Sequence, residues 1–378
     1  MHGPRTSIGK SGEKDIVRWC ARRFELPVAI QSRYDATTYQ LLLLVAAVRN
    51  LFLESALNSC RYLRGMEVPS PRSFLYRLRT WSEGGRLEGA LMRLNHQVLA
   101  EARRRRSLPN RAVVAIDETD PRYYGKEGRM ACRRGKEKRG TTWFHRAATV
   151  SLIVRGSRFT VAWVKVLPMM SKKDVVAALL DAAEEWVDVK LVLMDRGFYS
   201  WPVRRLLRER GVRLLMAAPK YAREKMVVAR CKGLNWLADP FFEERGHVWT
   251  LIVVDNRWLR EQLADRRVEK GYSLWLTDLP FHGNPLPYVR VYNRRWSIEN
   301  SYQEEDRFEA RTKSPKASLR FCMILVGVVL RNLWVLLRTW NPWLTTFLLR
   351  EIIHDMANEL IGERSFDPRL RDIWGEDG

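Results

Sequence analysis

Cysteine is scarce in this sequence and is not arranged for cross-linking or zinc binding. The five cysteines stand at positions 20, 60, 132, 231 and 322, without two-residue spacings and without a neighbouring pair of histidines. A zinc knuckle and a disulfide framework both need such regular spacings. The distribution is typical of a reduced, intracellular chain, and we therefore expect a cytoplasmic protein.

Long uninterrupted apolar segments are also lacking. The first fifteen residues, MHGPRTSIGKSGEKD, contain no apolar core of the signal-peptide type, and the most apolar later stretch, FCMILVGVVLRNLWVLL, is interrupted by Arg331. A membrane-spanning helix needs about 20 mostly apolar residues, and a signal peptide needs a continuous apolar centre. The sequence thus predicts no membrane-directed segment.

Acidic residues are outnumbered by basic ones. Lysine and arginine total 66 against 43 aspartates and glutamates, which gives a net charge of +23 and an isoelectric point near 10.2. This excess favours a polyanionic partner. The dominance of arginine favours phosphate, because a planar guanidinium can grip two oxygens at once. A merely solubilising charge and an anionic membrane surface are the alternatives.

The chain is long enough for two or three packed units, since 378 residues exceed the usual size of one hydrophobic core. Residues 1–108 are expected to be helical and basic. The run from Asp35 to Leu57 is apolar all round, as in a helix buried among others. Ser70 is placed to cap a second, arginine-rich helix that begins at Pro71.

This arginine-rich helix carries Arg72 and Arg77. Two short helices across a glycine turn, the second one basic, are typical of a helix-turn-helix reader of DNA. The alternative is a pair of plainly packed helices. We therefore treat residues 1–108 as a DNA-end-binding region by hypothesis, with Arg72 and Arg77 as candidate DNA contacts.

From residue 109 to about 345 the pattern changes to β-branched runs that alternate with helical segments. AVVAI, ATVSLIV and FTVAWVKV predict a strand and a hairpin, and DVVAALLDAAEEW and KLVLM predict a helix and a further strand. This order predicts a mixed α/β core. Residues from about 220 to 280 add a second β-rich patch, and residues 346–378 are expected to form a C-terminal helix and tail.

Asp117 and Asp195 each follow a short, fully apolar strand. A carboxylate in that place is costly unless it turns into solvent or meets a cation. Each aspartate alone is equally typical of a turn. Two of them in one sheet repel and need a cation between them, and hard oxygen ligands select Mg²⁺ or, as a substitute, Mn²⁺.

Tyr292, Arg295 and Glu299 are spaced by three and then four residues, which places them on one face of a helix. The glutamate could reach toward the strand ends, and the tyrosine and arginine could hold a phosphate. By spacing alone, the pattern also fits a salt-bridged helix surface.

These three residues, read as YNRRWSIE, resemble the signature of insertion-sequence DDE transposases that carry a β-strand insertion before the catalytic glutamate. AIDETDPRYYGK at Asp117, HRAATVSLIV as the hairpin strand and MDRGFY at Asp195 extend the resemblance over residues 110–340. It implies a ribonuclease-H-like core with Asp117 on the first strand, Asp195 at the end of the fourth and Glu299 on a following helix. It also implies that residues 220–280 are the insertion.

The sequence departs from the family pattern after the glutamate. The position of the family lysine is Asp306 here, and Arg307 follows it. A one-residue shift turns a side chain by about 100° around a helix, so Arg307 is a candidate DNA contact without being an automatic replacement.

Two further features bear on DNA. Family members often flip a base during cleavage, for which Trp275 is a candidate platform; the alternative is a tryptophan packed in a sheet.

The segment from Pro121 to Arg146 has nine basic and two acidic residues and follows the first aspartate. We expect a charged loop there that guides DNA phosphates or is disordered.

These features together predict a DNA transposase that cuts at the terminal inverted repeats of its element and joins them to target DNA. We expect a homodimer in the DNA complex and a nucleoid-associated protein in the cytoplasm. A ribonuclease-H-like nuclease without strand transfer and an inactive DNA-binding relic or regulator are the alternatives.

Overall fold

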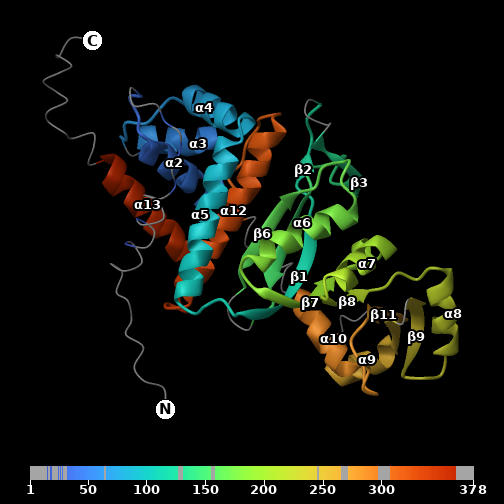
Figure 1. Ribbon diagram of the computed structural model, residues 1–378. Coiled ribbons are helices and arrows are strands. Elements are labelled where there is room, and N and C mark those ends of the chain that lie inside the picture. Colours follow the sequence, from blue (N-terminus) through green and yellow to red (C-terminus); the bar gives the residue numbers. More distant parts are fainter. Residues whose placement is uncertain are drawn as a thin grey trace, which may run out of the picture. The chain divides into compact units, whose positions relative to one another are not determined.

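The computed structural model describes residues 32–63, 65–126, 131–154, 158–244, 247–264, 271–296 and 307–362, with isolated positions before residue 32. Its contacts divide the chain into two compact units, which Figure 1 shows in sequence colours. The first unit comprises Met1–Leu108, Asp120–His145 and Tyr302–Gly378, and the second comprises Pro109–Thr119 and Arg146–Ser301. This division differs from the sequence-based one, which assigned all of residues 109–345 to the core.

Within the described residues, the second unit is built on one mixed sheet of eight strands with the order β6-β5-β1-β7-β8-β11-β10-β9. The strands are β1 (Arg111–Thr119), β5 (Ala147–Leu152), β6 (Thr160–Lys165), β7 (Asp188–Met194), β8 (Arg213–Ala217), β9 (Trp236–Glu244), β10 (His247–Asp255) and β11 (Tyr272–Thr277). The β5–β6 hairpin pairs antiparallel with β1, whereas β1, β7 and β8 are parallel. This confirms the mixed α/β core of ribonuclease-H type.

Two helices cover strands that are buried on both faces. β5 is buried along its whole length, and the last four residues of β7 are buried as well. Strands of this kind need cover on both sides. α6 (Lys172–Glu184) packs against β5, β6 and β7, and α7 (Trp201–Glu209) packs against β8 and α6.

The segment from residue 220 to 280 continues the core sheet, although we expected a second β-rich patch there. β11 pairs antiparallel with β8, with Trp275 opposite Ala217, and β10 and β9 follow. α8 (Ala222–Arg230) precedes β9, and α9 (Asn256–Leu263) lies between β10 and β11. The insertion therefore extends the same sheet that carries Asp117 and precedes Asp195.

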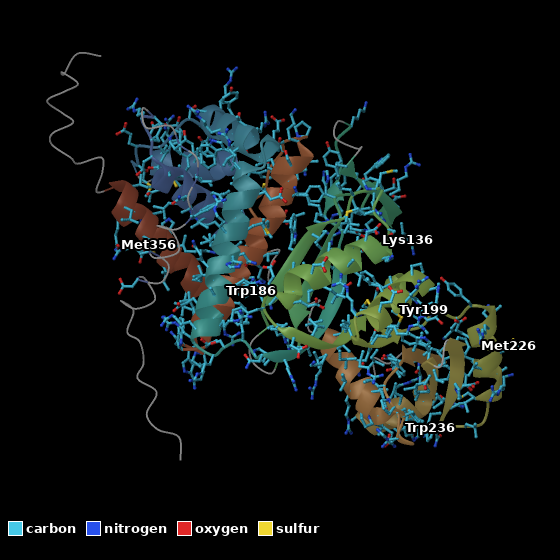
Figure 2. The ribbon with its side chains drawn as sticks, viewed as in Figure 1. Lys136, Trp186, Tyr199, Met226, Trp236 and Met356 are labelled. Atoms are coloured by element: carbon cyan, nitrogen blue, oxygen red, sulfur yellow. The ribbon has the colours of Figure 1, made fainter. Side chains whose placement is uncertain are left out.

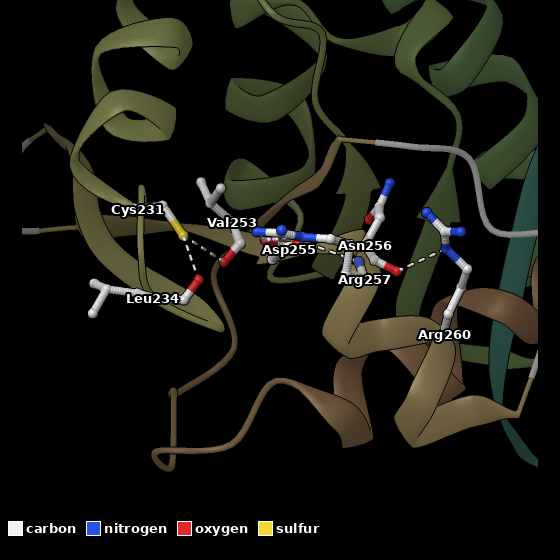
Figure 3. A network of polar contacts seen from close by, with 7 residues as sticks. All are labelled: Cys231, Leu234, Val253, Asp255, Asn256, Arg257 and Arg260. Carbon is white, nitrogen blue, oxygen red and sulfur yellow. Dashed lines mark hydrogen bonds and ion pairs between the residues drawn. The ribbon is translucent and has the colours of Figure 1, made fainter.

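Polar contacts fix the turn from β10 into α9 (Figure 3). Asp255 caps α9 by accepting a hydrogen bond of 2.7 Å from the backbone nitrogen of Arg257, and it pairs with the Arg257 guanidinium at 2.9 Å. The Cys231 thiol, directly after α8, lies 3.9 Å from the carbonyl oxygen of Val253. Burial and the charge of Asp255 raise the pKa of this thiol. Cys231 is thus an inert packing residue rather than a reactive one.

The first unit is mainly helical. Its helices include α2 (Ala36–Val48), α3 (Leu53–Asn58), α4 (Pro71–Glu83), α5 (Arg86–Arg104), α12 (Ala317–Arg338) and α13 (Thr346–Gly362). α12 packs along α5, where the side chains of Asn95 and Asn332 share a buried hydrogen bond of 2.8 Å, and α13 packs on α2. α12 is apolar and long enough to span a membrane, but 94% of its most apolar stretch is buried in the protein, as in a core helix.

Local sequence explains how these helices begin and end. Ser70 caps α4 by accepting a hydrogen bond from the backbone of Ser73, with Pro71 in the first turn, as predicted. The single helix expected from Asp35 to Leu57 is instead two, α2 and α3. Asn50, between them, has a φ of 51°, which no helix residue can adopt.

The basic segment after β1 is a small sheet, and the expectation of a loop was wrong for the described part. Its strands are β2 (Arg122–Tyr123), β4 (Thr141–Phe144) and β3 (Arg133–Lys138), in that order. The Tyr123 ring contacts His145 at 4.7 Å and lies under the Arg320 guanidinium at 4.7 Å; His145 meets Phe321 edge-on at 5.4 Å. The small sheet is therefore anchored to α12.

Candidate active site

Asp117 and Asp195 lie side by side in the core sheet. β1 and β7 are parallel neighbours, and their last paired residues are Ile116 and Met194. Asp117 is the next residue of β1 and Asp195 directly follows β7, and neighbouring strands are about 4.8 Å apart. Asp117 is part of β1, opposite Thr149 of β5, as the family resemblance implied, whereas the apolar run alone placed it just beyond the strand.

Backbone contacts orient both carboxylates. Asp117 Oδ1 accepts a hydrogen bond of 2.8 Å from the nitrogen of Glu118. Asp195 caps the short 3₁₀ turn Arg196–Phe198, where its Oδ1 accepts a bond of 2.8 Å from the nitrogen of Gly197. A Cβ on Gly197 would lie only 3.0 Å from that oxygen, so any side chain at this position would crowd the Asp195 carboxylate.

Arg295 joins Asp117 to Tyr292. α10 (Leu286–Asn293) carries Tyr292 and then tightens into the 3₁₀ turn Arg294–Trp296, whereas we expected one continuous helix. Nη1 of Arg295 donates to Asp117 Oδ2 at 2.9 Å, with 9% and 14% of the two side chains exposed. The Arg295 guanidinium also lies 5.5 Å from the centre of the Tyr292 ring.

The charges at this site are coupled. Burial raises the pKa of Tyr292, and Arg295 opposes that effect. Burial acts to lower the pKa of Arg295, but the charges of Tyr292 and Asp117 outweigh it, and the pKa is raised. Both residues therefore stay protonated at neutral pH, and Arg295 keeps a positive charge beside Asp117.

Glu299 and Asp306 lie outside the described residues. Among the residues that are described, no three histidine, cysteine, aspartate or glutamate side chains are gathered for a metal ion. Asp117 and Asp195 supply two hard oxygen donors of the type that Mg²⁺ and Mn²⁺ prefer. These donors fit a divalent ion, and Glu299 remains the predicted third.

Trp275 of β11 is an interior residue. It is 5% exposed, and its ring meets Tyr292 edge-on with centres 6.1 Å apart. This position matches the alternative in which the tryptophan packs in the sheet. To stack against a flipped base, the Trp275 ring would first have to become exposed. The structure therefore favours a role in packing against Tyr292.

Sequence reasoning missed the role of Glu118. Its carboxylate pairs with Lys172 at 2.5 Å and Arg146 at 3.3 Å, and only 12% of the side chain is exposed. Lys172 Nζ also lies 4.8 Å from the centre of the Phe198 ring, in the turn that Asp195 caps. The alternation of side chains along a strand, which puts Glu118 on the face opposite Asp117, was the available signal.

The remaining predicted DNA contacts belong to the first unit. Arg72 and Arg77 lie on the exposed face of α4, beside Tyr76, which is 66% exposed. Arg307 is exposed as well.

Comparison with known proteins agrees with this geometry. The sequence profile of the transposase DDE domain matches residues 109–331. No curated protein matches the sequence. The fold is similar to that of piggyBac transposase, solved by cryo-EM as a synaptic complex with hairpin DNA, with a TM-score of 0.62 and 12% identity over 98% of this chain and 84% of that chain.

The profile match includes both strand-end aspartates, Tyr292, Arg295 and the segment with Glu299. It covers more than half of the chain, and DDE transposases generally use divalent metal ions. With the mixed sheet and the paired aspartates, it shows that the chain belongs to the DDE transposase family.

Proposed function

We propose that this transposase cuts DNA at the ends of its element and joins those ends to target DNA, with Asp117, Asp195 and Glu299 as metal-binding carboxylates. The observation that carries the proposal is the juxtaposition of Asp117 and Asp195 at the carboxyl ends of neighbouring parallel strands, with Arg295 paired to Asp117. Ligand and reaction sites of open α/β sheets lie at such strand ends.

The donor set favours Mg²⁺, with Mn²⁺ as a substitute. Asp117 and Asp195 would hold the ions together with Glu299. When bound, the ions would activate the attacking water or 3′ hydroxyl and stabilise the leaving oxygen. The carboxylates act through their charge, because an uncharged amide of the same shape binds such ions far more weakly.

Tyr292 and Arg295 would hold the DNA strand that is cut. The raised pKa of Tyr292 keeps its hydroxyl protonated, so it can donate a hydrogen bond to a phosphate oxygen. Arg295 remains charged and has five N–H donors, enough to contact Asp117 and a phosphate at once. The two side chains would position the phosphate for attack, and such positioning contributes a large part of the rate enhancement.

Two basic surfaces of the first unit would bind DNA phosphates. One is the exposed face of α4 with Arg72 and Arg77. The other is the β3–β4 hairpin, where Arg134, Lys136 (Figure 2) and Lys138 are exposed on a folded sheet. A preformed surface binds without first having to be ordered. Affinity should fall steeply with salt, since each phosphate contact releases a counterion.

We further propose a homodimer in the DNA complex, with one protomer cutting each element end, and Arg307 as a phosphate contact. The mass of the complex formed with terminal DNA measures the first point. The DNA affinity of Arg307→Ala measures the second.

A strand-transfer assay tests the proposal as a whole. The protein is incubated with labelled terminal DNA, a target plasmid and Mg²⁺, Mn²⁺ or Ca²⁺. We expect cut and joined products with Mg²⁺ and Mn²⁺, and binding without efficient cutting in Ca²⁺, whose looser coordination suits the reaction poorly. Cut ends that never join would indicate a nuclease. Binding without any cutting would indicate an inactive regulator.

A further inference from the structure

A largely buried chain of polar side chains follows Asp195 and has no part in the chemistry described above. The Tyr199 hydroxyl donates a hydrogen bond of 2.6 Å to Glu224 Oε1. The Arg204 guanidinium lies 5.0 Å from the centre of the Tyr199 ring and also forms a hydrogen bond with that hydroxyl. Figure 2 labels Tyr199 in the second unit.

These groups are far more buried than their charges favour. Glu224 is 3% exposed and Arg204 is 5% exposed. Burial lowers the pKa of Arg204, and burial together with Glu224 raises the pKa of Tyr199. Tyr199 therefore stays neutral and bridges a buried cation and a buried carboxylate. Removing one member of such an arrangement leaves the others unpaired.

The chain ties the second aspartate to the insertion. Tyr199 ends the turn that Asp195 begins, and Glu224 lies in the first turn of α8, the first helix of the insertion. Arg204 lies on α7, the next helix after that turn. One end of the 195–199 segment is thus fixed by β7 and the other by Tyr199, with Phe198 buried between them.

We propose that Tyr199, Glu224 and Arg204 are positioning residues for Asp195. Their hydrogen-bonded chain holds the turn after β7 against α8, so that the Asp195 carboxylate keeps the orientation needed to bind a divalent ion. The inference rests on the proposed function, in which Asp195 is a metal ligand. Groups that orient a metal ligand from behind commonly change metal affinity about 10–100-fold when they are lost.

The test compares Tyr199→Phe with Tyr221→Phe. Each substitution removes one hydroxyl, and the two rings are neighbours at 6.4 Å, but Tyr221 is 63% exposed. Three quantities are measured: Mn²⁺ affinity of the DNA-bound protein by electron paramagnetic resonance, the cleavage rate, and the unfolding temperature. Glu224→Gln is the second variant, because its amide oxygen can still accept the bond from Tyr199.

We expect Tyr199→Phe to weaken Mn²⁺ binding about tenfold and to raise the Mn²⁺ concentration needed for cleavage by a similar factor. Glu224→Gln should shift both in the same direction by less, and Tyr221→Phe should match the unmodified protein. A Tyr199→Phe protein that binds Mn²⁺ normally would overturn the inference, even if it unfolds at a lower temperature. If the unmodified protein neither binds Mn²⁺ nor cuts DNA, the proposed function itself fails, and the inference with it.

Discussion

Asp117 and Glu118 are adjacent acidic residues with different surroundings. Side chains alternate between the faces of a strand, so the two carboxylates point in opposite directions. Asp117 meets Arg295 at the candidate site, whereas Glu118 is held between Lys172 and Arg146. Glu118→Gln is therefore not a neutral control for Asp117→Asn, because the ion pairs of Glu118 give that substitution a structural cost.

We predict that Glu118→Gln lowers the free energy of unfolding by about 1–3 kcal/mol, because it leaves two largely buried cations without their carboxylate. Cleavage per folded molecule should fall much less than in Asp117→Asn. Denaturant unfolding and a cleavage assay on the same preparations measure both.

Asp188→Asn is the better control for the aspartates. Asp188 begins β7, the strand that ends before Asp195, and its side chain is 47% exposed in pairs with Lys190 and Arg111. Exposed pairs contribute about 0–1 kcal/mol, so stability and cleavage should both stay close to normal. If Glu118→Gln were as stable as the unmodified protein, the structural role given to the ion pairs of Glu118 would be wrong.

At the scale of elements, periodicity predicted the core well. The hairpin β5–β6, helix α6 and strand β7 appear where the β-branched runs and an amphipathic run placed them. The small sheet β2-β4-β3 escaped prediction because its charged residues dominate the local pattern. Its anchoring depends on Tyr123 and His145, which contact Arg320 and Phe321 of α12, and a contact with so distant a segment leaves no local signal.

His145 makes the small sheet sensitive to acid. Burial, with the charge of Arg320, lowers the pKa of His145 to about 4, from an unfolded value near 6.5. Because the pKa of His145 is lower in the folded state, the stability that the neutral imidazole contributes is complete above the pKa of the unfolded state. It is lost as the pH falls toward the pKa of the folded state. Between about pH 6.5 and 4 this loss is at most about 3 kcal/mol.

The measurement compares thermal unfolding of the protein and of His145→Gln from pH 7.5 to 4.5. Glutamine does not titrate, so the stability advantage of the unmodified protein should shrink as the pH falls. A difference that stays constant over this range would show that folding does not lower the pKa of His145.

At the scale of the whole molecule, the C-terminal segment completes the N-terminal helices. α12 packs along α5, and α13 packs on α2. The apolar stretch from Phe321 to Leu337 is evident in the sequence but its partner is not, since hydrophobicity shows that a segment is buried without showing what covers it. The sequence-based division into residues 1–108 and 109–345 differs from the observed units for that reason.

We therefore predict that residues 1–108 alone do not fold cooperatively, because α5 would expose the face that α12 buries. Circular dichroism should show no sharp thermal transition for this fragment, whereas the full chain should show one. End binding by this region, a prediction from the sequence, is then best measured in the full chain. A fragment of residues 1–108 that melts cooperatively would contradict the role given to α12.

The central claim is that Asp117, Asp195 and Glu299 together hold the ions that cut DNA. The direct measurement is cleavage of terminal DNA by Asp117→Asn, Asp195→Asn and Glu299→Gln, with DNA binding measured alongside. Each amide keeps the shape of the side chain and removes the charge that holds a cation. We predict that each variant loses more than about 100-fold in cleavage, beyond the loss typical of an outer-shell partner, while it binds DNA as well as the unmodified protein. Cleavage at the normal rate by any of the three would contradict the account.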